Sequence, residues 1–494
     1  MMQARSKANL TGILGGTLGL IVVLASAALA QPFTGRLMIL DTANHQVHVF
    51  DLESEGVVET FAITQSMAPG FGTLLARTSN GRLGLVAQRS GHFSPENDPS
   101  VNVIALVDSG LTVEDHGDHF DALRQTPRQL PYRMGHGGGQ FGLYRPIHID
   151  AHHGLIAIHY DGSRHPDDDA QNINAQVLAY SEADLVSRTQ PIPLFDLDAG
   201  SHQHGAAIAF NEDLFVVSVG TPDASLGGLD YSTLPRGAAT FNAAGEEQQD
   251  FRGRCPQLHG SAITGAFVAF GCNEGPRNMA DPDYTGPPIT ARSGVLVLTH
   301  DGGSPGAFTV AEVTYPEDGS DTTSGTLRSG TGPSEGIIIA SYGPMQFLKI
   351  IGAQVQDGTP NGSSLIDVAG TIETHDIEHA DDNFPQGQGR FIVLTEAGDL
   401  HIFDLTRMAG EELVTTVPGV VADVSGGCPD AGCPQLALAP GAAYLSEPAL
   451  GMVHEVDLNN AVVTRQFDFS SLGAIPASLE VFGWFGLEAP LVFE

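Results

Sequence analysis

Histidines and carboxylates are concentrated in one short stretch, Val113 to His119, which reads Val-Glu-Asp-His-Gly-Asp-His. Neutral imidazoles and carboxylates bind divalent transition metals without thiolate ligands. His116 and His119 stand three residues apart, and Gly117 between them lets the backbone bend. A pair this short chelates one ion only in a turn or on a helix face, so the other ligands must come from elsewhere. The stretch therefore predicts part of a metal site.

Further histidines stand at or just before the starts of apolar runs along the chain: His148, His202, His204 and His259. Each alone is more often a strand-end histidine with a hydrogen-bond partner than a ligand. Their recurrence at equivalent places is more informative. A zinc site needs three or four ligands at about 2.0–2.2 Å, and residues distant in sequence can supply them. We expect the fold to gather some of these histidines onto one zinc ion.

A second cluster runs from His375 to Asp382, with His375 and His379 four residues apart. On one helical turn these two would share a face, which would allow a weak second metal site. A solvated loop within an insert is the favoured interpretation. The same interpretation covers the remaining paired histidines, which are His45, His48, His152, His153, His159 and His165.

Two patterns invite a hydrolase interpretation. Gly332 to Gly336 satisfies G-x-S-x-G, and His136 to Gly139 resembles the oxyanion loop of lipases. A nucleophile elbow requires a strand, a sharp turn and then a helix, but Ser334 precedes an apolar β run at 337–339. No βαβ pattern connects the two motifs, so both are interpreted as chance matches and the chain as a non-enzyme.

Charge narrows the classes of partner. The 494 residues include 22 basic and 58 acidic side chains, a net charge of −36. Such a chain cannot build the basic groove that follows phosphates, which excludes nucleic acid as a partner. It repels anionic lipid and attracts cations. Solubility alone also explains much of the acidity, so the charge by itself does not demonstrate metal binding.

Residues 1–30 have the pattern of a targeting segment. Arg5 and Lys7 form a basic start, an apolar run follows from Leu10 to Ala27, and Ala28-Leu29-Ala30 is a small-x-small cleavage signal. The run is long enough for a retained membrane anchor, but its glycines and threonines favour cleavage. We therefore expect a periplasmic protein that does not contact the membrane after cleavage, with residues 31–494 as a single domain.

Four cysteines fall into two close pairs, Cys255 with Cys272 and Cys428 with Cys433. An even count in an exported chain predicts disulfides. The alternative, a four-cysteine zinc site, would need thiolates that an oxidising compartment disfavours.

Short apolar runs bounded by Gly, Asn, Asp and Pro recur throughout the chain, and helical periodicity is almost absent. They group into modules of about fifty to sixty residues, the period of propeller blades rather than helical solenoids. We therefore expect an all-β fold, a β-propeller of eight blades, with seven blades or two β-sandwiches in series as alternatives. The modules are 36–51, 82–108, 155–180, 206–219, 262–298, 336–351, 391–405 and 436–457, with polar inserts such as 371–389 between strands.

The chain resembles the AztD type of periplasmic zinc chaperone, which accompanies a zinc ABC importer and its solute-binding protein. The resemblance depends on motifs in the first half of the chain that keep their order. They are Arg36–Asp41, Val49–Leu52, Val107–Gly110 leading into Val113–His119, Arg145–His148, His204-Gly205, and Cys255–Gly260 with Ala269–Cys272. The second half matches only in its strand pattern.

The resemblance implies a β-propeller that binds zinc through histidines and a carboxylate and delivers it to the importer's binding protein. Carried over residue by residue, it implies the ligands His116, Asp118, His119, His148, His204 and His259, with Asp115 as the alternative carboxylate. We also expect the protein to be a monomer. Family members often carry a His-rich segment near the mature N-terminus, whereas Gln31 to Arg36 holds no histidine, which puts a relay step through such a tail in doubt.

Two other functional classes remain open from the sequence. A metal-dependent propeller hydrolase, such as a lactonase, would use the ion to polarise a carbonyl or activate water. Such an enzyme usually needs more oxygen ligands than this histidine set supplies. A propeller that serves only as an interaction platform would bind no metal at all.

Overall fold

The computed structural model describes most of the chain from Thr34 onward. The described ranges are 34–63, 73–88, 102–115, 120–135, 145–162, 173–187, 190–200, 202–220, 222–223, 228–229, 235–255, 257–272, 294–302, 307–315, 326–357, 362–380 and 387–483. They belong to one compact unit. Within these ranges, no helix combines the length and apolar character needed to cross a bilayer.

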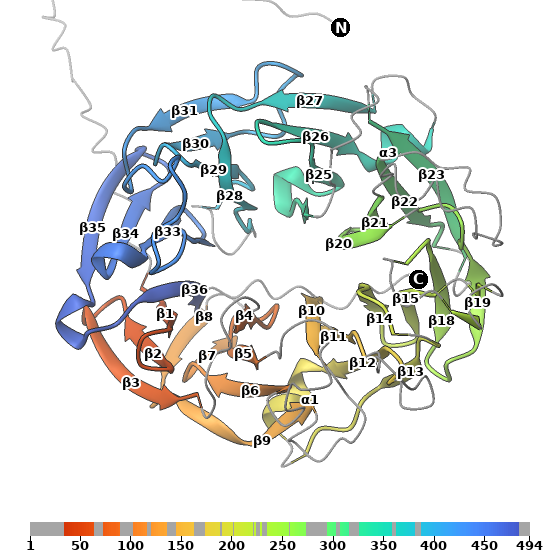
Figure 1. The fold of residues 1–494 in the computed structure, drawn as a ribbon, viewed down its shortest axis with the longest axis horizontal. Coiled ribbons are helices and arrows are strands. Elements are labelled where there is room, and N and C mark those ends of the chain that lie inside the picture. Colours follow the sequence, from red (N-terminus) through yellow and green to blue (C-terminus); the bar gives the residue numbers. More distant parts are fainter. Residues whose placement is uncertain are drawn as a thin grey trace, which may run out of the picture. The chain divides into compact units, whose positions relative to one another are not determined.

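Eight four-stranded antiparallel sheets form the unit and are arranged as the blades of a ring (Figure 1). From the inner strand outward, the first four blades are β36 (Pro476–Phe482), β1 (Arg36–Asp41), β2 (Gln46–Asp51), β3 (Gly56–Ala62); β4 (Leu74–Arg77), β5 (Leu83–Gln88), β6 (Val103–Asp108), β9 (Arg128–Gly135); β10 (Pro146–His152), β11 (Leu155–Tyr160), β12 (Gln176–Ser181), β13 (Phe195–Asp198); and β14 (Ala207–Asn211), β15 (Leu214–Ser218), β18 (Ala238–Asn242), β19 (Glu247–Asp250).

The second four blades are β20 (Leu258–Thr264), β21 (Phe267–Cys272), β22 (Gly294–His300), β23 (Phe308–Thr314); β24 (Leu327–Ser329), β25 (Ile337–Ser341), β26 (Gln346–Ile351), β27 (Ser363–Asp367); β28 (Ile372–Ile377), β29 (Phe391–Thr395), β30 (Leu400–Phe403), β31 (Leu413–Val417); and β32 (Leu436–Ala439), β33 (Ala442–Glu447), β34 (Met452–Asp457), β35 (Val462–Asp468). The expected eight-bladed propeller is confirmed, and the seven-blade and two-sandwich alternatives are wrong.

Smaller elements connect the blades. Two hairpins project from them, β7 (Leu111–Asp115) with β8 (Phe120–Arg124) and β16 (Pro222–Asp223) with β17 (Gly228–Leu229). The described helices are all short: α1 (Glu182–Ser187), α3 (Gly352–Gln356) and the 3-10 turns η5 (Gly332–Ser334), η6 (Pro448–Leu450) and η7 (Ser470–Leu472).

The middle strands of each blade are buried on both faces because blades pack against one another. In β1 and β5 all six residues are buried, whereas the outer strand β3 contains only half-buried and exposed positions. Continuous apolar runs, rather than strict alternation, mark strands that are covered on both sides. This is why the middle strands were the easiest to recognise in the sequence.

The ring is closed by the C-terminal strand. β36 pairs antiparallel with β1 at the start of the described chain, with Leu37 opposite Val481 and Ile39 opposite Leu479. The first blade therefore takes its inner strand from one end of the chain and its other three strands from the other end, which Figure 1 shows as dark blue beside red. This closure explains why the first and last sequence modules each look incomplete.

Inner strands all run in the same direction along the central channel, because every blade is antiparallel and its fourth strand leads back to the start of the next inner strand. Residues near the starts of β10 and β20 therefore lie at one end of the channel, and residues after the ends of β10, β20 and β28 lie at the other. Position along an inner strand thus gives depth in the channel.

Both expected disulfides are present in the structure, Cys255–Cys272 and Cys428–Cys433. The first is buried and ties the segment that leads into β20 to the end of β21. That segment ends two residues before His259, so the disulfide fixes the start of an inner strand.

One sequence interpretation is wrong. The region 371–389 was expected to be a polar insert, yet β28 within it is the inner strand of the seventh blade. His375 lies on this strand and is buried against Phe347 and Phe391, with ring centroids 4.6 and 5.8 Å away. His375 and His379 do not share a helical turn, so the proposed second chelate at 375–382 has no structural basis in the described part of the cluster.

The G-x-S-x-G match has a structural role. Ser334 lies in the 3-10 turn η5, is fully buried, and donates its hydroxyl to the Gly389 carbonyl at 2.6 Å. No strand–turn–helix elbow presents it to a ligand. His136 to Gly139 lie outside the described residues.

We expect Leu479→Ala to destabilise the protein by about 2–5 kcal/mol, because Leu479 is buried in the closing strand and its truncation leaves a cavity. Urea unfolding followed by circular dichroism measures the change. Leu472→Ala is the matched control, since Leu472 is 49% exposed; its effect should stay within about 0.5 kcal/mol. Equal unfolding midpoints for the two variants would contradict a stabilising role for ring closure.

Candidate metal centre

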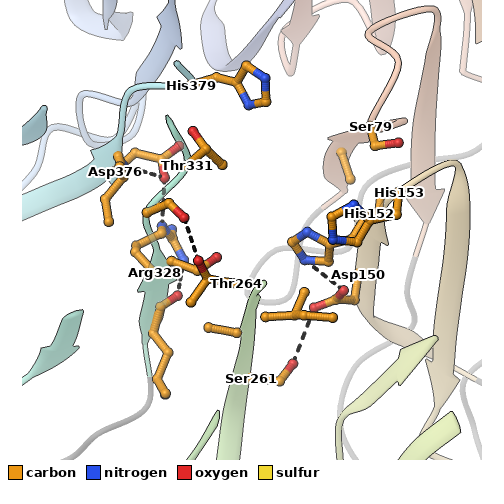
Figure 2. A pocket seen from close by; sticks show the side chains of 18 of the residues that line it. Ser79, Asp150, His152, His153, Ser261, Thr264, Arg328, Thr331, Asp376 and His379 are labelled. Atoms are coloured by element: carbon orange, nitrogen blue, oxygen red, sulfur yellow. Dashed lines mark hydrogen bonds and ion pairs between the residues drawn. The ribbon is translucent and has the colours of Figure 1, made fainter. Parts of the chain in front are cut away.

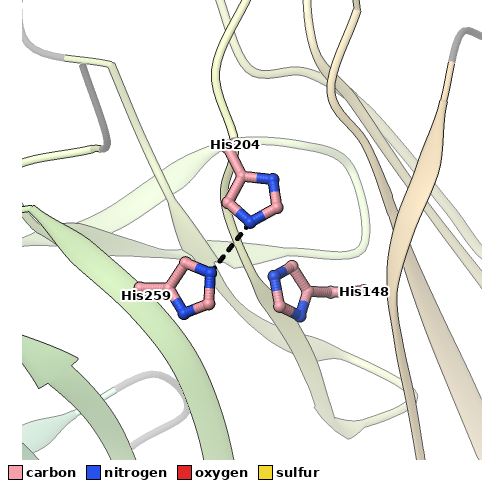
Figure 3. A group of neighbouring side chains, drawn as sticks. All are labelled: His148, His204 and His259. Carbon is pink, nitrogen blue, oxygen red and sulfur yellow. Dashed lines mark hydrogen bonds between the residues drawn. The ribbon is translucent and has the colours of Figure 1, made fainter. Parts of the chain in front are cut away.

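Three histidines from adjacent blades converge at the end of the channel where the inner strands begin. His148 is on β10, His204 is in the segment before β14, and His259 is on β20. Each offers one ring nitrogen, and these nitrogens all lie within 4.8 Å of one another. Figure 3 shows the three rings turned toward a common point. Successive members of this group are up to 56 positions apart in the sequence, so it is the packing of the blades into a ring that brings all three together.

The contact between His204 and His259 has the geometry of two metal ligands. Their Nε2 atoms are 2.9 Å apart. Two nitrogens bound to a tetrahedral zinc at normal bond lengths are about 3.3 Å apart, so a small movement of either ring admits an ion. Nδ1 of His204 lies 3.1 Å from Oδ2 of Asp161. A proton on Nδ1 donated to this carboxylate leaves the Nε2 lone pair for a metal, the usual arrangement of a histidine ligand.

Asp161 is the buried anion behind this site. Its side chain is fully buried, and Nη1 of the equally buried Arg145 lies 3.3 Å from its Oδ2. Nδ1 of His159 is 3.6 Å from its Oδ1. Burial alone would raise the pKa of Asp161, but the His159 and His204 side chains lower it below its ordinary range. The carboxylate is therefore ionised, Arg145 balances its charge, and it acts on the site through its hydrogen bond with His204.

His148 is prepared to bind a metal as a neutral imidazole. Its Nε2 is buried and has no hydrogen-bond partner among the described residues. Burial, followed by the neighbouring His204 and His259 rings, lowers the pKa of His148 well below its ordinary value. A buried polar nitrogen without a partner is costly unless something binds it. The donor set therefore fits a divalent zinc ion.

A cavity of about 720 Å³ connects this site with the other end of the channel. His148 and His259 line it at one end, and residues at or just after the ends of inner strands, including His153, Thr331 and His379, line it at the other. Figure 2 shows side chains from opposite walls facing each other across it. The site is thus partly enclosed but reachable by solvent and ions.

The structure brings together three of the predicted ligands, His148, His204 and His259. His202 is buried and is not part of the group. His116, Asp118 and His119 lie outside the described residues. The flanking strands, β7 and β8, come after the end of β6, which is the third strand of its blade. Arg124 on β8 forms an ion pair with Asp51. This hairpin therefore starts at the end of the ring opposite the three histidines, and the alternative ligand Asp115 ends its first strand.

Sequence reasoning missed Asp161 and assigned His159 to a solvated loop. His159 is instead fully buried on β11, and Asp161 follows directly after that strand. The alternation His159, Tyr160, Asp161 at the end of a predicted strand could have signalled two polar groups on one face. Gly205 is required beside them, because a Cβ there would overlap the His159 ring and the Ser218 hydroxyl.

The chain is a homologue of the zinc chaperone AztD of Citrobacter koseri, with 24% identity over 367 residues, which is 74% of this chain and 72% of the relative. Two solved structures of that AztD have the same fold. The apo structure gives a TM-score of 0.66 at 21% identity and covers 91% of this chain and 98% of AztD. The other gives 0.67 at 22%, covering 92% and 99%. No family model matches the chain. The resemblance inferred from the motifs is confirmed.

We expect the metal-free protein to lose stability as the pH falls from 7.5 to 5.5, partly because of His159. Burial lowers the pKa of His159 despite the opposing effect of Asp161. In the unfolded chain His159 therefore takes up a proton near pH 6.5, whereas in the folded protein it does so only at lower pH. This difference lowers the free energy of unfolding by at most about 1.4 kcal/mol over this range.

Urea unfolding of wild type and His159→Gln at both pH values, in the presence of a chelator, measures this contribution. The variant should lose less stability between pH 7.5 and 5.5 than wild type. The comparison cancels the titration of groups that do not interact with His159. An identical pH dependence in the two proteins would contradict a depressed pKa for His159.

Proposed function

We infer that this protein is an extracytoplasmic zinc-binding metallochaperone that holds one zinc ion on His148, His204 and His259. The observation that carries the proposal is the convergence of three ring nitrogens from three blades, with Asp161 behind one of them. Homology to a zinc chaperone supports the choice of metal. Imidazole suits zinc, and neither a thiolate nor a second carboxylate is needed.

Three protein ligands leave the fourth position of a tetrahedral zinc open to water or to a group from another protein. This is the coordination expected of a zinc ion that the protein must later transfer. An incoming ligand can bind before a histidine dissociates, so the ion is exchanged without ever being released as the free aqueous ion. The proposed recipient is the zinc-specific solute-binding protein of an ABC importer.

The two disulfides and the signal-like segment at residues 1–30 are consistent with a periplasmic location. The net charge of −36 raises the local concentration of cations around the protein. The Asp161 carboxylate holds the His204 ring with its Nε2 toward His259 and the proposed metal position. Both effects favour loading from a dilute pool of metal.

The acidic histidine stretch remains a prediction. Three histidines and Asp161 complete the proposed site without His116, Asp118 or His119. The number of zinc ions bound per protein in a His116→Ala/His119→Ala double variant tests whether these residues are ligands. An unchanged number limits the ligand set to the three histidines. Loss of one ion shows that this stretch also binds zinc.

We expect each of His148→Ala, His204→Ala and His259→Ala to weaken zinc binding by more than the roughly 100-fold typical of residues that only support a ligand. Competition with a chromophoric chelator measures the affinity. His45→Asn is the control, because His45 lies in the β1–β2 turn and Asn tolerates its φ of 53°. Wild-type affinity in the His204 variant would refute the proposed site.

Asp161→Asn should weaken zinc binding about 10- to 100-fold without abolishing it, because it removes the charge that orients His204 but no direct ligand. Stoichiometry should stay at that of wild type. Circular dichroism checks that the fold survives the loss of the buried partner of Arg145. A complete loss of binding in a folded variant would instead make Asp161 a direct ligand.

A further inference from the structure

One wall of the cavity carries a row of ligand-type side chains that leads away from the three histidines. Side chains on a strand alternate between its two faces, so His148, Asp150 and His152 on β10 point the same way. All three line the cavity. The residues between them, Ile149 and Ala151, also border the cavity, but they pack against the core between the second and third blades. We call these three side chains the β10 row.

The spacing of the β10 row fits short steps of a metal ion. Residues on one face of a strand are about 6.6 Å apart, so His152 lies about 13 Å from His148 along the strand. An ion bound at about 2 Å from its ligands cannot cover 13 Å in one exchange. Asp150 divides this distance in two, and each half is short enough for neighbouring side chains to share the ion.

Asp150 and His152 already form a pair. Nε2 of His152 lies 2.9 Å from Oδ1 of Asp150, and the Ser261 hydroxyl donates to the other carboxylate oxygen at 3.4 Å. The two side chains are 13% and 26% exposed, so ions in the cavity reach them. Figure 2 shows the pair on one wall of the cavity. A nitrogen and an oxygen at this separation can chelate one ion with little movement.

Two other acidic side chains of the cavity are neutralised by arginines. Asp376 is paired with Arg328 at 3.0 Å, and Glu480 with Arg77 at 3.4 Å. A cation approaching these carboxylates also meets a guanidinium. The carboxylate of Asp150 contacts a histidine and a serine instead of an arginine, so the β10 wall attracts a divalent cation more strongly than these two ion pairs do.

We propose that Asp150 and His152 are a transit site through which zinc passes between the three histidines and the far mouth of the channel. The inference depends on the proposed function. Two ligands hold the ion less tightly than three, which a transit site requires, since it must bind well enough to accept the ion and weakly enough to release it. The pair lowers the barrier between the buried site and solvent in both directions.

A kinetic experiment tests the transit site. Zinc loading of the metal-free protein and zinc release into excess chelator are followed by stopped-flow absorbance for wild type, Asp150→Asn and His152→Gln. Both rates should fall at least about tenfold while the equilibrium Kd stays unchanged, because a group on the path alters the barrier and not the end states. His152→Gln leaves the charge of the cavity intact, so it separates coordination from electrostatic attraction.

His379→Gln is the matched control, because His379 is a histidine lining the same cavity on the seventh blade. Its rates should equal those of wild type. Unchanged rates in Asp150→Asn and His152→Gln would overturn the proposal. So would a weaker Kd with faster release, which would make the pair part of the equilibrium site, or an equal slowing in His379→Gln. Wild-type zinc affinity in His204→Ala would instead refute the proposed function itself.

Discussion

Pairing of β36 with β1 is the constraint on which the rest of the molecule depends. Each blade is buried on both faces, so no blade is stable without two neighbours, and the ring must close. The closing pair joins residues more than four hundred positions apart, and its side chains lie in one core with those of the eighth blade. With the ring closed, the inner strands are held in a fixed register around the channel, and the starts of β10 and β20 face each other.

The metal centre shows what this rigid frame makes possible. Arg145, His159 and Asp161 are buried side by side, and this cluster would be costly if each charge were alone. Arg145 and His204 both contact the Asp161 carboxylate, so the buried charges of Arg145 and Asp161 balance each other and the carboxylate holds the His204 ring in place. Nε2 of His148 remains without a partner among the described residues, and a bound ion would satisfy it.

Much of the fold and part of the site could be predicted from the sequence. The blade count, the middle strands and both disulfide pairs follow from local patterns of apolar residues and cysteines. Three histidines of the site were identified because they recur at module starts. The inner strand β28 was mistaken for an insert because Glu373, His375 and Asp376 make it polar, and polarity was equated with exposure. Inner strands face a channel, so they carry polar residues without being loops.

The sequence by itself determined the blades, because the two-sided burial of a strand leaves a continuous apolar run that any reader can find. It also determined which residue types could bind zinc. Only the tertiary structure decided which of them meet. His204 gains its carboxylate from the residue that follows β11 in the preceding blade, and His148 gains its neighbours from two other blades. Distances across a closed ring depend on how all eight sheets pack, and no local pattern in the chain records that packing.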